Sequence, residues 1–378
     1  MEYADRGVKS TESDQEWAIK RAMKTDIHQH LWTEPLVQAL AQRTEFPFVR
    51  DEHGLTVLFL AGERPYVIDL ASEVPARRAE LVRRDGLHGA LLCLSSPLGI
   101  ESLPRAQAQP LLDAYHEGAL ALGEPFGVWG AIALDDPDQD DVDRALQRGC
   151  VGVSLPAGAL SGVDRLARVQ PLLARLERRG APLFVHPGPG FGQGAAPGAG
   201  MSLLGDPLWW PALTHYVADM HAAWLAFLHA GRIEHPELKI VFAMLAGLAP
   251  LHAERLAARG GPDRLRPIRP AHDPLVFYDT SSYGPAAIGA LTEAIGGPGQ
   301  LLYGSDRPVV EPTLLEEPAT LDWELLADTT ARAFGEGSGQ DRPQDTEATE
   351  RSTEAAQSPE TAQSRPTATR RGIVGAVR

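Results

Sequence analysis

Apolar runs of strand length alternate with longer amphipathic stretches from about residue 21 to residue 334. Eight of these runs have the composition of buried strands, and they span residues 25–30, 88–94, 127–134, 149–155, 182–186, 238–244, 275–280 and 300–304. Segments with helical periodicity lie between most of them and after the last, at residues 107–122, 142–147, 165–179, 215–228, 250–259, 286–295 and 321–334. Strands separated by helices predict parallel pairing through right-handed crossovers.

Eight strand–helix units within residues 21–334 favour one α/β domain, a single (β/α)8 barrel of the TIM type. The main rival is an open Rossmann-like sheet, whose first strand is followed by a Gly-rich turn. Here the first strand runs into the sequence HQHLW, from His28 to Trp32, so the rival is disfavoured.

Three segments fall outside this repeating pattern. Residues 46–80 form an insertion after the first strand, and the part around residues 51–68 predicts a small β-hairpin that serves as an active-site lid or as a surface flap. Residues 1–20 are expected to form a flexible N-terminal arm. Residues 335–378 contain no aromatic side chain and almost no apolar one before Ile373, so they bury too little surface to offset chain entropy. We expect a disordered tail there.

The net charge of −15 excludes some classes of function. A nucleic-acid surface needs clustered Lys and Arg to neutralise phosphates, and a strongly acidic balance argues against one. No apolar run reaches the roughly 18 residues of a transmembrane helix, and the N-terminus has no signal-like apolar segment. Cys93 and Cys150 lie in strand-like stretches and are predicted to be reduced, buried thiols. We therefore expect a cytoplasmic protein with a small-molecule substrate and no nucleic-acid or membrane partner; a homodimer is left open.

The pair His28 and His30 is the first candidate for chemistry. Side chains at positions i and i+2 of a strand point to the same face, so both imidazoles enter the same side while Gln29 points away. The carboxyl ends of barrel strands are where these folds keep their active sites. Two convergent imidazoles suit Zn²⁺, Fe²⁺ or Mn²⁺.

His186 and Asp306 stand at the ends of two further predicted strands. His186 closes the run APLFVH and is followed by Pro187 and Gly188, which stop the strand. Asp306 follows the run QLLYGS. A carboxylate there can ligate a metal and take a proton from bound water, or it can cap the next helix. Taken together, strands one, five and eight predict a metal site of His28, His30, His186 and Asp306.

Other side chains are weaker candidates for substrate binding. Arg307, directly after Asp306, can pair with a substrate carboxylate or with a carboxylate of the protein itself. Trp32 can line the pocket or pack in the core, and the same holds for Trp209 and Trp210. His215 is a further weak candidate for substrate binding.

The chain resembles the amidohydrolase superfamily, in the branch that includes aminocarboxymuconate-semialdehyde decarboxylase and the amidohydrolase family 2 proteins. The matching stretches are DIHQH, GVSLP, VHPG, GRIEHPELKIVFAMLAGLAPLHAERL and DTSSYGPAAIGALTEAIGGPGQLLYGSDRP, which together extend from about residue 25 to Phe334. The resemblance implies a barrel with one metal ion held by the paired histidines, the strand-five histidine and the strand-eight aspartate. It also implies activity on small carboxylates, acyl groups or C–C bonds.

One position departs from that branch, whose sixth strand ends in a histidine followed by glycines. Met244 stands there in this chain, and a thioether does not take up a proton. Three alternatives follow: a histidine such as His215, His221 or His252 replaces it, Asp306 handles all proton transfers, or turnover is poor. The fourth strand, GCVGVSLP, contains no lysine that could bridge two metals, so a binuclear centre is disfavoured.

The sequence thus predicts a metal-dependent amidohydrolase-related enzyme, either a hydrolase or a non-oxidative decarboxylase (a carboxy-lyase). Its substrate is expected to be a small carboxylate or cyclic compound, with Asp306 as the catalytic group and metal ligand. One divalent ion is expected, with Zn²⁺ preferred over Mn²⁺ and Fe²⁺. The rival from another class is a catalytically impaired metal-binding barrel that acts as a binding or scaffold protein.

Overall fold

The structure is a computed structural model, and it describes residues 24–61, 63–191, 207, 209–259, 273–312 and 322–335. The predicted N-terminal arm, 1–20, lies outside these residues, and so does the predicted tail, 335–378, apart from its first residue. Within the described residues no helix is both long and apolar enough to span a membrane.

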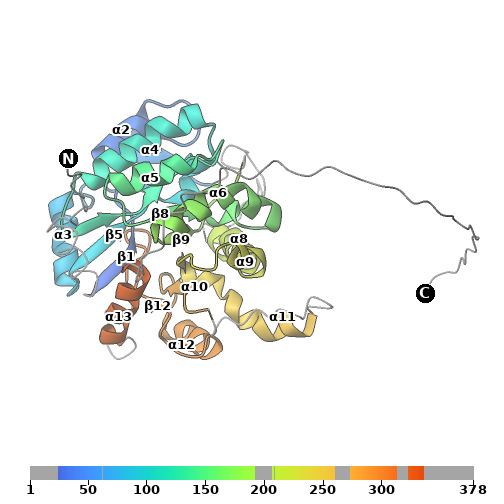
Figure 1. Ribbon diagram of the computed structural model, residues 1–378. Helices are drawn as coiled ribbons and strands as arrows, with labels where there is room; N and C mark the ends of the chain where they lie inside the picture. Colours follow the sequence, from blue (N-terminus) through green and yellow to red (C-terminus); the bar gives the residue numbers. More distant parts are fainter. Residues whose placement is uncertain are drawn as a thin grey trace, which may run out of the picture. The chain divides into compact units, whose positions relative to one another are not determined.

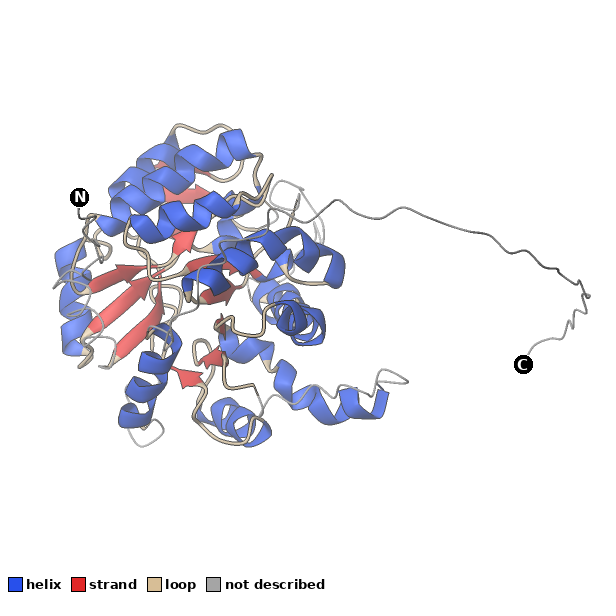
Figure 2. Ribbon diagram, in the orientation of Figure 1, coloured by secondary structure: helices blue, strands red, loops and turns tan. Residues whose placement is uncertain are grey.

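Parallel strands are found at all eight predicted positions, and helices surround them (Figures 1 and 2). One sheet has the order β1-β5-β6, with β1 at Thr25–Gln29, β5 at Gly89–Leu92 and β6 at Phe126–Val128. The other has the order β12-β11-β10-β9-β8-β7. Its strands are β7 (Gly130–Ala131), β8 (Val153–Pro156), β9 (Leu183–His186), β10 (Ile240–Phe242), β11 (Val276–Asp279) and β12 (Leu301–Leu302). The predicted parallel α/β pattern is therefore confirmed.

Backbone hydrogen bonds connect the two sheets at both of their edges. At one edge only Trp129 separates β6 from β7, and the amide of Val151, just before β8, donates to the carbonyl of Val128 in β6 at 2.9 Å. At the other edge the amide of Ile27 donates to the carbonyl of Tyr303 at 2.8 Å. The amide of Asp306 donates to the carbonyl of His28 at 2.9 Å. β1 therefore lies beside the chain that contains and follows β12, although the two are far apart in the sequence.

Most of the helices lie between successive strands and bury residues in the core. They are α2 (Glu34–Ala41), α3 (Pro75–Arg84), α4 (Arg105–Leu120), α5 (Gln139–Gln147), α6 (Val163–Arg179), α7 (Trp210–Leu213), α8 (His215–Ala226), α9 (Arg232–Glu234), α10 (Met244–Gly247), α11 (Ala253–Arg259), α12 (Pro285–Ala294) and α13 (Trp323–Phe334). Short 3₁₀ turns lie at Ser96–Leu98, Ile100–Ser102, Ala157–Ala159 and Ala249–His252, and a π-helical turn at Phe227–Gly231 ends α8.

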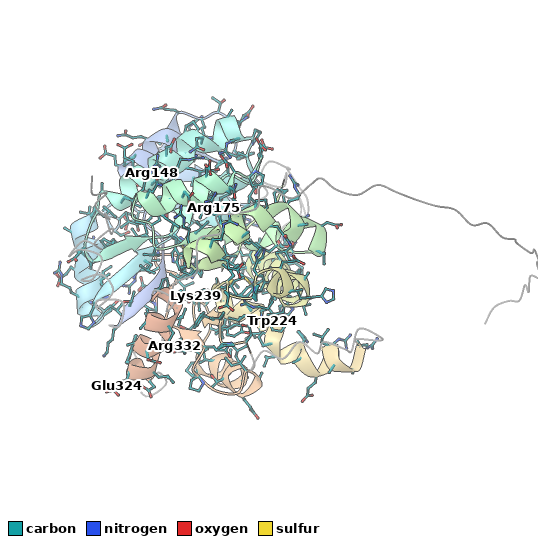
Figure 3. All side chains as sticks on the ribbon, in the orientation of Figure 1. Arg148, Arg175, Trp224, Lys239, Glu324 and Arg332 are labelled. Carbon is teal, nitrogen blue, oxygen red and sulfur yellow. The ribbon has the colours of Figure 1, made fainter. Side chains whose placement is uncertain are left out.

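Large aromatic side chains fill the space between strands and helices. Trp129 is fully buried and stacks on Phe184 of β9, with ring centroids 5.1 Å apart. Trp224 of α8, labelled in Figure 3, donates from Nε1 to the hydroxyl of Tyr278 in β11 at 3.2 Å. Because these indole N–H groups are satisfied, the aromatic core carries no polar penalty at these positions.

The insertion after β1 forms a separate antiparallel sheet of three strands. These are β2 (Phe48–Glu52), β3 (Leu55–Phe59) and β4 (Tyr66–Ile68), in the order β2-β3-β4. A hairpin was predicted around residues 51–68. The observed sheet starts three residues earlier, at Phe48, and has three strands instead of two. The turn falls at His53 and Gly54, which both have positive φ, so the polar sequence RDEHG spans a strand end and a tight turn. The insertion was predicted to span residues 46–80, and α3 begins within its last residues, at Pro75.

Candidate metal centre

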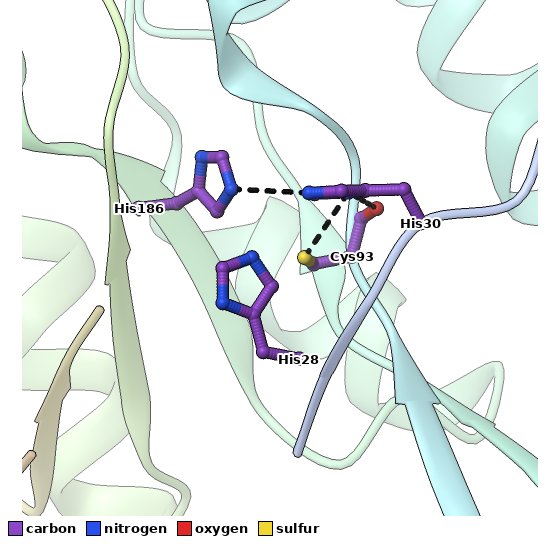
Figure 4. A group of neighbouring side chains, drawn as sticks. All are labelled: His28, His30, Cys93 and His186. Carbon is purple, nitrogen blue, oxygen red and sulfur yellow. Dashed lines mark hydrogen bonds between the residues drawn. The ribbon is translucent and has the colours of Figure 1, made fainter. Parts of the chain in front are cut away.

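Three imidazole rings meet at the ends of β1 and β9. His28 lies in β1, His30 follows it directly, and His186 ends β9. Their ring centroids are 4.9–5.1 Å apart, and all three residues are buried, with 1–4% of their surface exposed. The two Nε2 atoms of His30 and His186 are 3.3 Å apart (Figure 4). The structure therefore brings together the three histidines that the strand pattern singles out.

The Nδ1 atom of each of these histidines faces an acceptor in the protein. In His28 it faces Oδ2 of Asp279 at 2.7 Å, in His30 the carbonyl of Cys93 at 2.9 Å, and in His186 the carbonyl of Pro187 at 2.7 Å. An Nδ1–H group that donates to such an oxygen leaves the lone pair on Nε2. This is the tautomer in which a histidine binds a metal through Nε2 with an oriented ring.

Asp279 is a member of this arrangement that the sequence reasoning missed. It ends β11 and is fully buried, and the Ser281 hydroxyl donates to its Oδ2 at 2.6 Å while the Ser281 amide donates to Oδ1 at 3.0 Å. The available signal was its place at the end of a predicted strand, in the segment DTSSYG. It was overlooked because it supports a ligand rather than facing the centre.

Asp306 lies beside two of the histidines. Its Oδ1 is 3.1 Å from Nε2 of His30 and 3.4 Å from Nε2 of His28. Burial acts to raise the pKa of Asp306, but the attraction of His28 and the hydrogen bond with His30 outweigh it and hold the pKa at about 2. The carboxylate is therefore ionised near neutral pH. Its side chain is 14% exposed, so it is open to a ligand from one side.

Cys93 also belongs to this group of side chains. One ligand atom from each of His28, His30, Cys93 and His186 lies within 4.8 Å of the other three. The sequence predicts Cys93 as a reduced, buried thiol, and the structure confirms its burial and its lack of a disulfide. Its place among the histidines was not predicted, because it depends on how β5 aligns with β1.

Burial and its two neighbours decide the charge of His186. Burial lowers the pKa of His186 well below 6.5, and the positive charges of His28 and His30 lower it further. Three imidazoles this close cannot all carry a proton, because like charges in a buried site repel one another. The cluster thus favours at least one neutral imidazole, the form that coordinates metal ions.

Arg307 contacts carboxylates of the protein rather than the histidine group. It is 4% exposed, and its guanidinium lies 2.7 Å from Oδ2 of Asp85 and 3.4 Å from Oε2 of Glu311. Of the two predicted alternatives, the salt bridge within the protein is the one the structure shows. Trp32 is half-buried against the core, and its amide donates to Oε2 of Glu73 at 3.2 Å.

The three histidines considered as replacements for a strand-six histidine lie apart from the group. His215 is exposed at the start of α8. The Nε2 atom of His221 is hydrogen-bonded to the carbonyl of Gly247, and the ring packs edge-on against His252 with centroids 5.1 Å apart. Within the described residues none of the three shares a hydrogen bond or ring contact with His28, His30 or His186.

The chain after β10 turns with a left-handed backbone at the position of Met244. Met244, Leu245, Ala246 and Leu248 have φ between 50° and 65°, and Gly247 has φ 59°. Left-handed residues with a Cβ cost roughly 1–2 kcal/mol each, so glycines would adopt this turn more readily. Met244 itself is buried, with 8% of its surface exposed.

Glu63 and Tyr216 connect the insertion to α8. The Tyr216 hydroxyl donates to Oε1 of Glu63. Burial raises the pKa of Tyr216, and the negative charges of Glu63 and Asp306 raise it further. The insertion thus reaches α8 within electrostatic range of Asp306, a link that the sequence did not reveal.

Together, the parallel α/β fold and the His/Cys group define a class, enzymes that use a divalent metal ion at the ends of parallel strands. The chain belongs to the amidohydrolase family: the sequence model described as "Amidohydrolase" matches residues 25–338. The family predicted from the motifs is therefore confirmed, and the chain is an enzyme. No curated protein sequence matches it.

Three solved structures with the same fold are each less than a fifth identical to this chain in sequence. The IDCase of Metarhizium anisopliae in its apo form is 18% identical, with a TM-score of 0.63 over 84% of this chain and 92% of the other. A 2,6-dihydroxybenzoate decarboxylase bound to 2,6-dihydroxybenzoate is 18% identical, with a TM-score of 0.61 over 82% and 98%. A manganese complex of 5-carboxyvanillate decarboxylase from Novosphingobium aromaticivorans is 17% identical, with a TM-score of 0.52 over 68% and 77%.

Proposed function

We propose that this protein is a metal-dependent, non-oxidative decarboxylase of a small, hydroxylated aromatic acid. The observation that carries the proposal is the convergence of His28, His30 and His186, each with Nδ1 facing a protein oxygen, beside the ionised Asp306. The names of the fold neighbours favour decarboxylation over hydrolysis, since two of the three are called decarboxylases of benzoate derivatives.

His28, His30 and His186 would hold the metal, with Asp306 as the fourth ligand. The fit rests on Nε2 of His28, which is buried and forms no hydrogen bond within the described part of the chain. A buried nitrogen without a partner is costly unless something binds it. A divalent ion bound there would act as a Lewis acid towards the oxygens of the substrate.

Asp306 would carry the proton in the reaction. When the bond between the ring carbon and the carboxylate breaks, CO₂ leaves and the electron pair stays on the ring carbon, which then needs a proton. The Ser282 hydroxyl donates to Oδ2 of Asp306 at 3.3 Å and holds the carboxyl group in place. Because Asp306 is ionised, it would first take a proton from a substrate hydroxyl group or from water and then pass it to this carbon, without a strand-six histidine.

The finer features of the fold are also part of this proposal. We propose that the two sheets form one closed (β/α)8 barrel, which is supported by the hydrogen bonds between β1 and the chain around β12. The insertion at 46–80 would act as a lid, supported by the contact of Glu63 with Tyr216. Zn²⁺ is proposed as the metal although a fold neighbour holds manganese, and we propose a cytoplasmic location.

A second candidate function is hydrolysis of a cyclic amide or lactone at the same centre. The family name favours it, and the same His and Asp side chains would serve a metal-activated water. The two functions differ in what leaves the substrate, CO₂ in one case and an alcohol or amine in the other.

The test is a comparison of purified protein on two substrate panels, hydroxybenzoates on one side and lactones and amides on the other. We expect CO₂ release from the first panel and no product from the second. Asp306→Asn should abolish it, and His88→Ala, which changes an exposed histidine outside the site, should not. Ring opening of the second panel without CO₂ release would assign the protein to the hydrolases.

A further inference from the structure

We propose that the sulfur of Cys93 is a further ligand of the metal held by His28, His30 and His186. This inference rests on the metal site proposed above. It deepens that proposal by adding a donor of different chemistry to a centre otherwise made of imidazole and carboxylate.

The position of Cys93 follows from the pairing of β5 with β1. Gln29 of β1 is the partner of Leu92 of β5, and the amide of Cys93 donates to the carbonyl of Gln29 at 2.9 Å. The next residue on each strand is then His30 on one side and Cys93 on the other. Sγ of Cys93 lies 3.5 Å from Nδ1 of His30, a contact drawn as a dashed line in Figure 4.

The spacing of the four side chains is close to what a tetrahedral centre needs. Bonds of about 2.0–2.1 Å to nitrogen and 2.3 Å to sulfur place neighbouring ligand atoms about 3.3–3.8 Å apart. The group of His28, His30, Cys93 and His186 has one ligand atom from each residue within 4.8 Å of the others, and the nitrogens of His30 and His186 are already 3.3 Å apart.

The present partners of Cys93 and His28 leave room for such a bond. Sγ of Cys93 is 3.6 Å from the carbonyl of Gln29, which is a weak contact for a thiol, and the residue is 2% exposed. Nε2 of His28 lacks a hydrogen bond within the described residues, as noted above. The only polar group that His28 Nε2 approaches within the described residues, besides this cluster, is Oδ1 of Asp306 at 3.4 Å. A metal ion would give both Sγ and Nε2 a stronger partner at once.

Cys150 provides the contrast within the chain. It is also buried and reduced, but it is not among the residues grouped around the histidines. The neighbours of Cys150 are Gly149 and Val151, at the turn before β8. A thiol effect at the metal should therefore depend on Cys93 alone.

A sulfur ligand would change which metal the site prefers. Soft thiolate donors select Zn²⁺ or Fe²⁺ over Mn²⁺, which prefers oxygen donors. The sulfur thus gives a physical reason for Zn²⁺ in a fold whose neighbour holds manganese.

The test uses the full-length protein loaded with Co²⁺, whose bond to a thiolate gives a charge-transfer band in the near ultraviolet. We expect this band in the wild-type protein and in Cys150→Ala, and we expect it to be lost in Cys93→Ala and Cys93→Ser. Zn²⁺ affinity, measured by competition with a chelator, should fall on the order of tenfold or more in the two Cys93 variants. Mn²⁺ affinity should change little.

Two outcomes would overturn the inference and separate it from the proposed function. Cys93 is only a packing residue if wild-type protein binds Co²⁺ without the band, or if the Cys93 variants keep the band and full Zn²⁺ affinity. In either case the metal site itself stands as long as His28→Ala loses the metal. If His28→Ala binds Zn²⁺ as tightly as wild type, the metal site itself fails, and the role of Cys93 fails with it. The wild-type spectrum requires no variant to fold.

Discussion

Nδ1 of His28 lies 2.7 Å from Oδ2 of Asp279, although the two residues are 251 positions apart in the sequence. This contact fixes the ring of a proposed metal ligand from the end of β11 and directs its Nε2 towards His30 and His186. It therefore makes the metal site depend on a carboxylate that lies outside the group of side chains around the metal position.

Asp279→Asn tests this dependence. The amide is close in size but is a weaker acceptor for the imidazole, so we expect Zn²⁺ affinity to fall by about 10- to 100-fold. Competition with a chelator measures it. Asp273→Asn, which weakens an ion pair with Arg232 away from the site, is the matched control. Unchanged affinity in Asp279→Asn would mean that the orientation of His28 is set by packing alone.

Asp306→Asn tests the proton transfer. We expect turnover to fall by roughly 10²- to 10⁴-fold, because an amide cannot deliver a proton at the reacting carbon. Steady-state CO₂ release on the responsive substrate measures kcat, and the metal content of the same sample shows whether the ion is still bound. Full activity in a metal-loaded Asp306→Asn protein would transfer the role to another group.

Gly247→Ala tests the left-handed turn after β10. Gly247 has φ 59°, and an added Cβ would lie 3.2 Å from both His221 and the carbonyl of Val217. We expect the free energy of unfolding to fall by about 1–2 kcal/mol from the backbone alone. Gly289→Ala, in the open middle of α12, should instead raise it by about 0.5–1 kcal/mol. Urea denaturation of both variants measures these changes in the free energy of unfolding. Equal changes in the two variants would contradict the left-handed turn at Gly247.

Glu101 predicts how stability depends on pH. Burial raises the pKa of Glu101 to about 7 from 4.5, with the hydrogen bond from Ser96 acting against it. Because the folded state holds the Glu101 proton more tightly than the unfolded state, the contribution of Glu101 to stability is full at low pH and is lost as pH rises from about 4.5 to 7. The loss from this one group is on the order of 3 kcal/mol.

Glu101→Gln should remove that loss. The neutral amide keeps a similar shape and needs no proton, so the variant should gain on wild type as pH rises from 5 to 8. Unfolding by urea at several pH values measures the difference. Glu117→Gln, an exposed change on α4, serves as the control and should leave the pH profile as it is. If the free energy of unfolding changed with pH in the same way in wild type and in Glu101→Gln, the raised pKa of Glu101 would be disproved.

Local patterns accounted for much of the candidate site. The i, i+2 spacing of His28 and His30 requires only that residue 28 lie in a strand, and the proline and glycine after His186 mark a strand end. The eight strands were predicted for the same reason, since apolar runs and their breakers are properties of neighbouring residues. The predicted ends of the strands were less exact, because hydrogen bonding to the neighbouring strands decides where each strand stops.

The contacts that were missed or left open depend on residues that the sequence places far apart. Cys93 reaches the histidines because of the register between β1 and β5, and Asp279 does so because β11 ends beside β1. Arg307 follows Asp306 in the chain, but the backbone at Asp306 is left-handed, with φ 59°, and the Arg307 side chain pairs with Asp85 instead of entering the site.

The sequence by itself determined the family, the order of strands and helices, and three histidines able to bind a metal, because these follow from local periodicity and short motifs. Only the tertiary structure decided which side chains surround those histidines. That choice depends on strand register and on hydrogen bonds between segments hundreds of residues apart, and no local pattern encodes either of them.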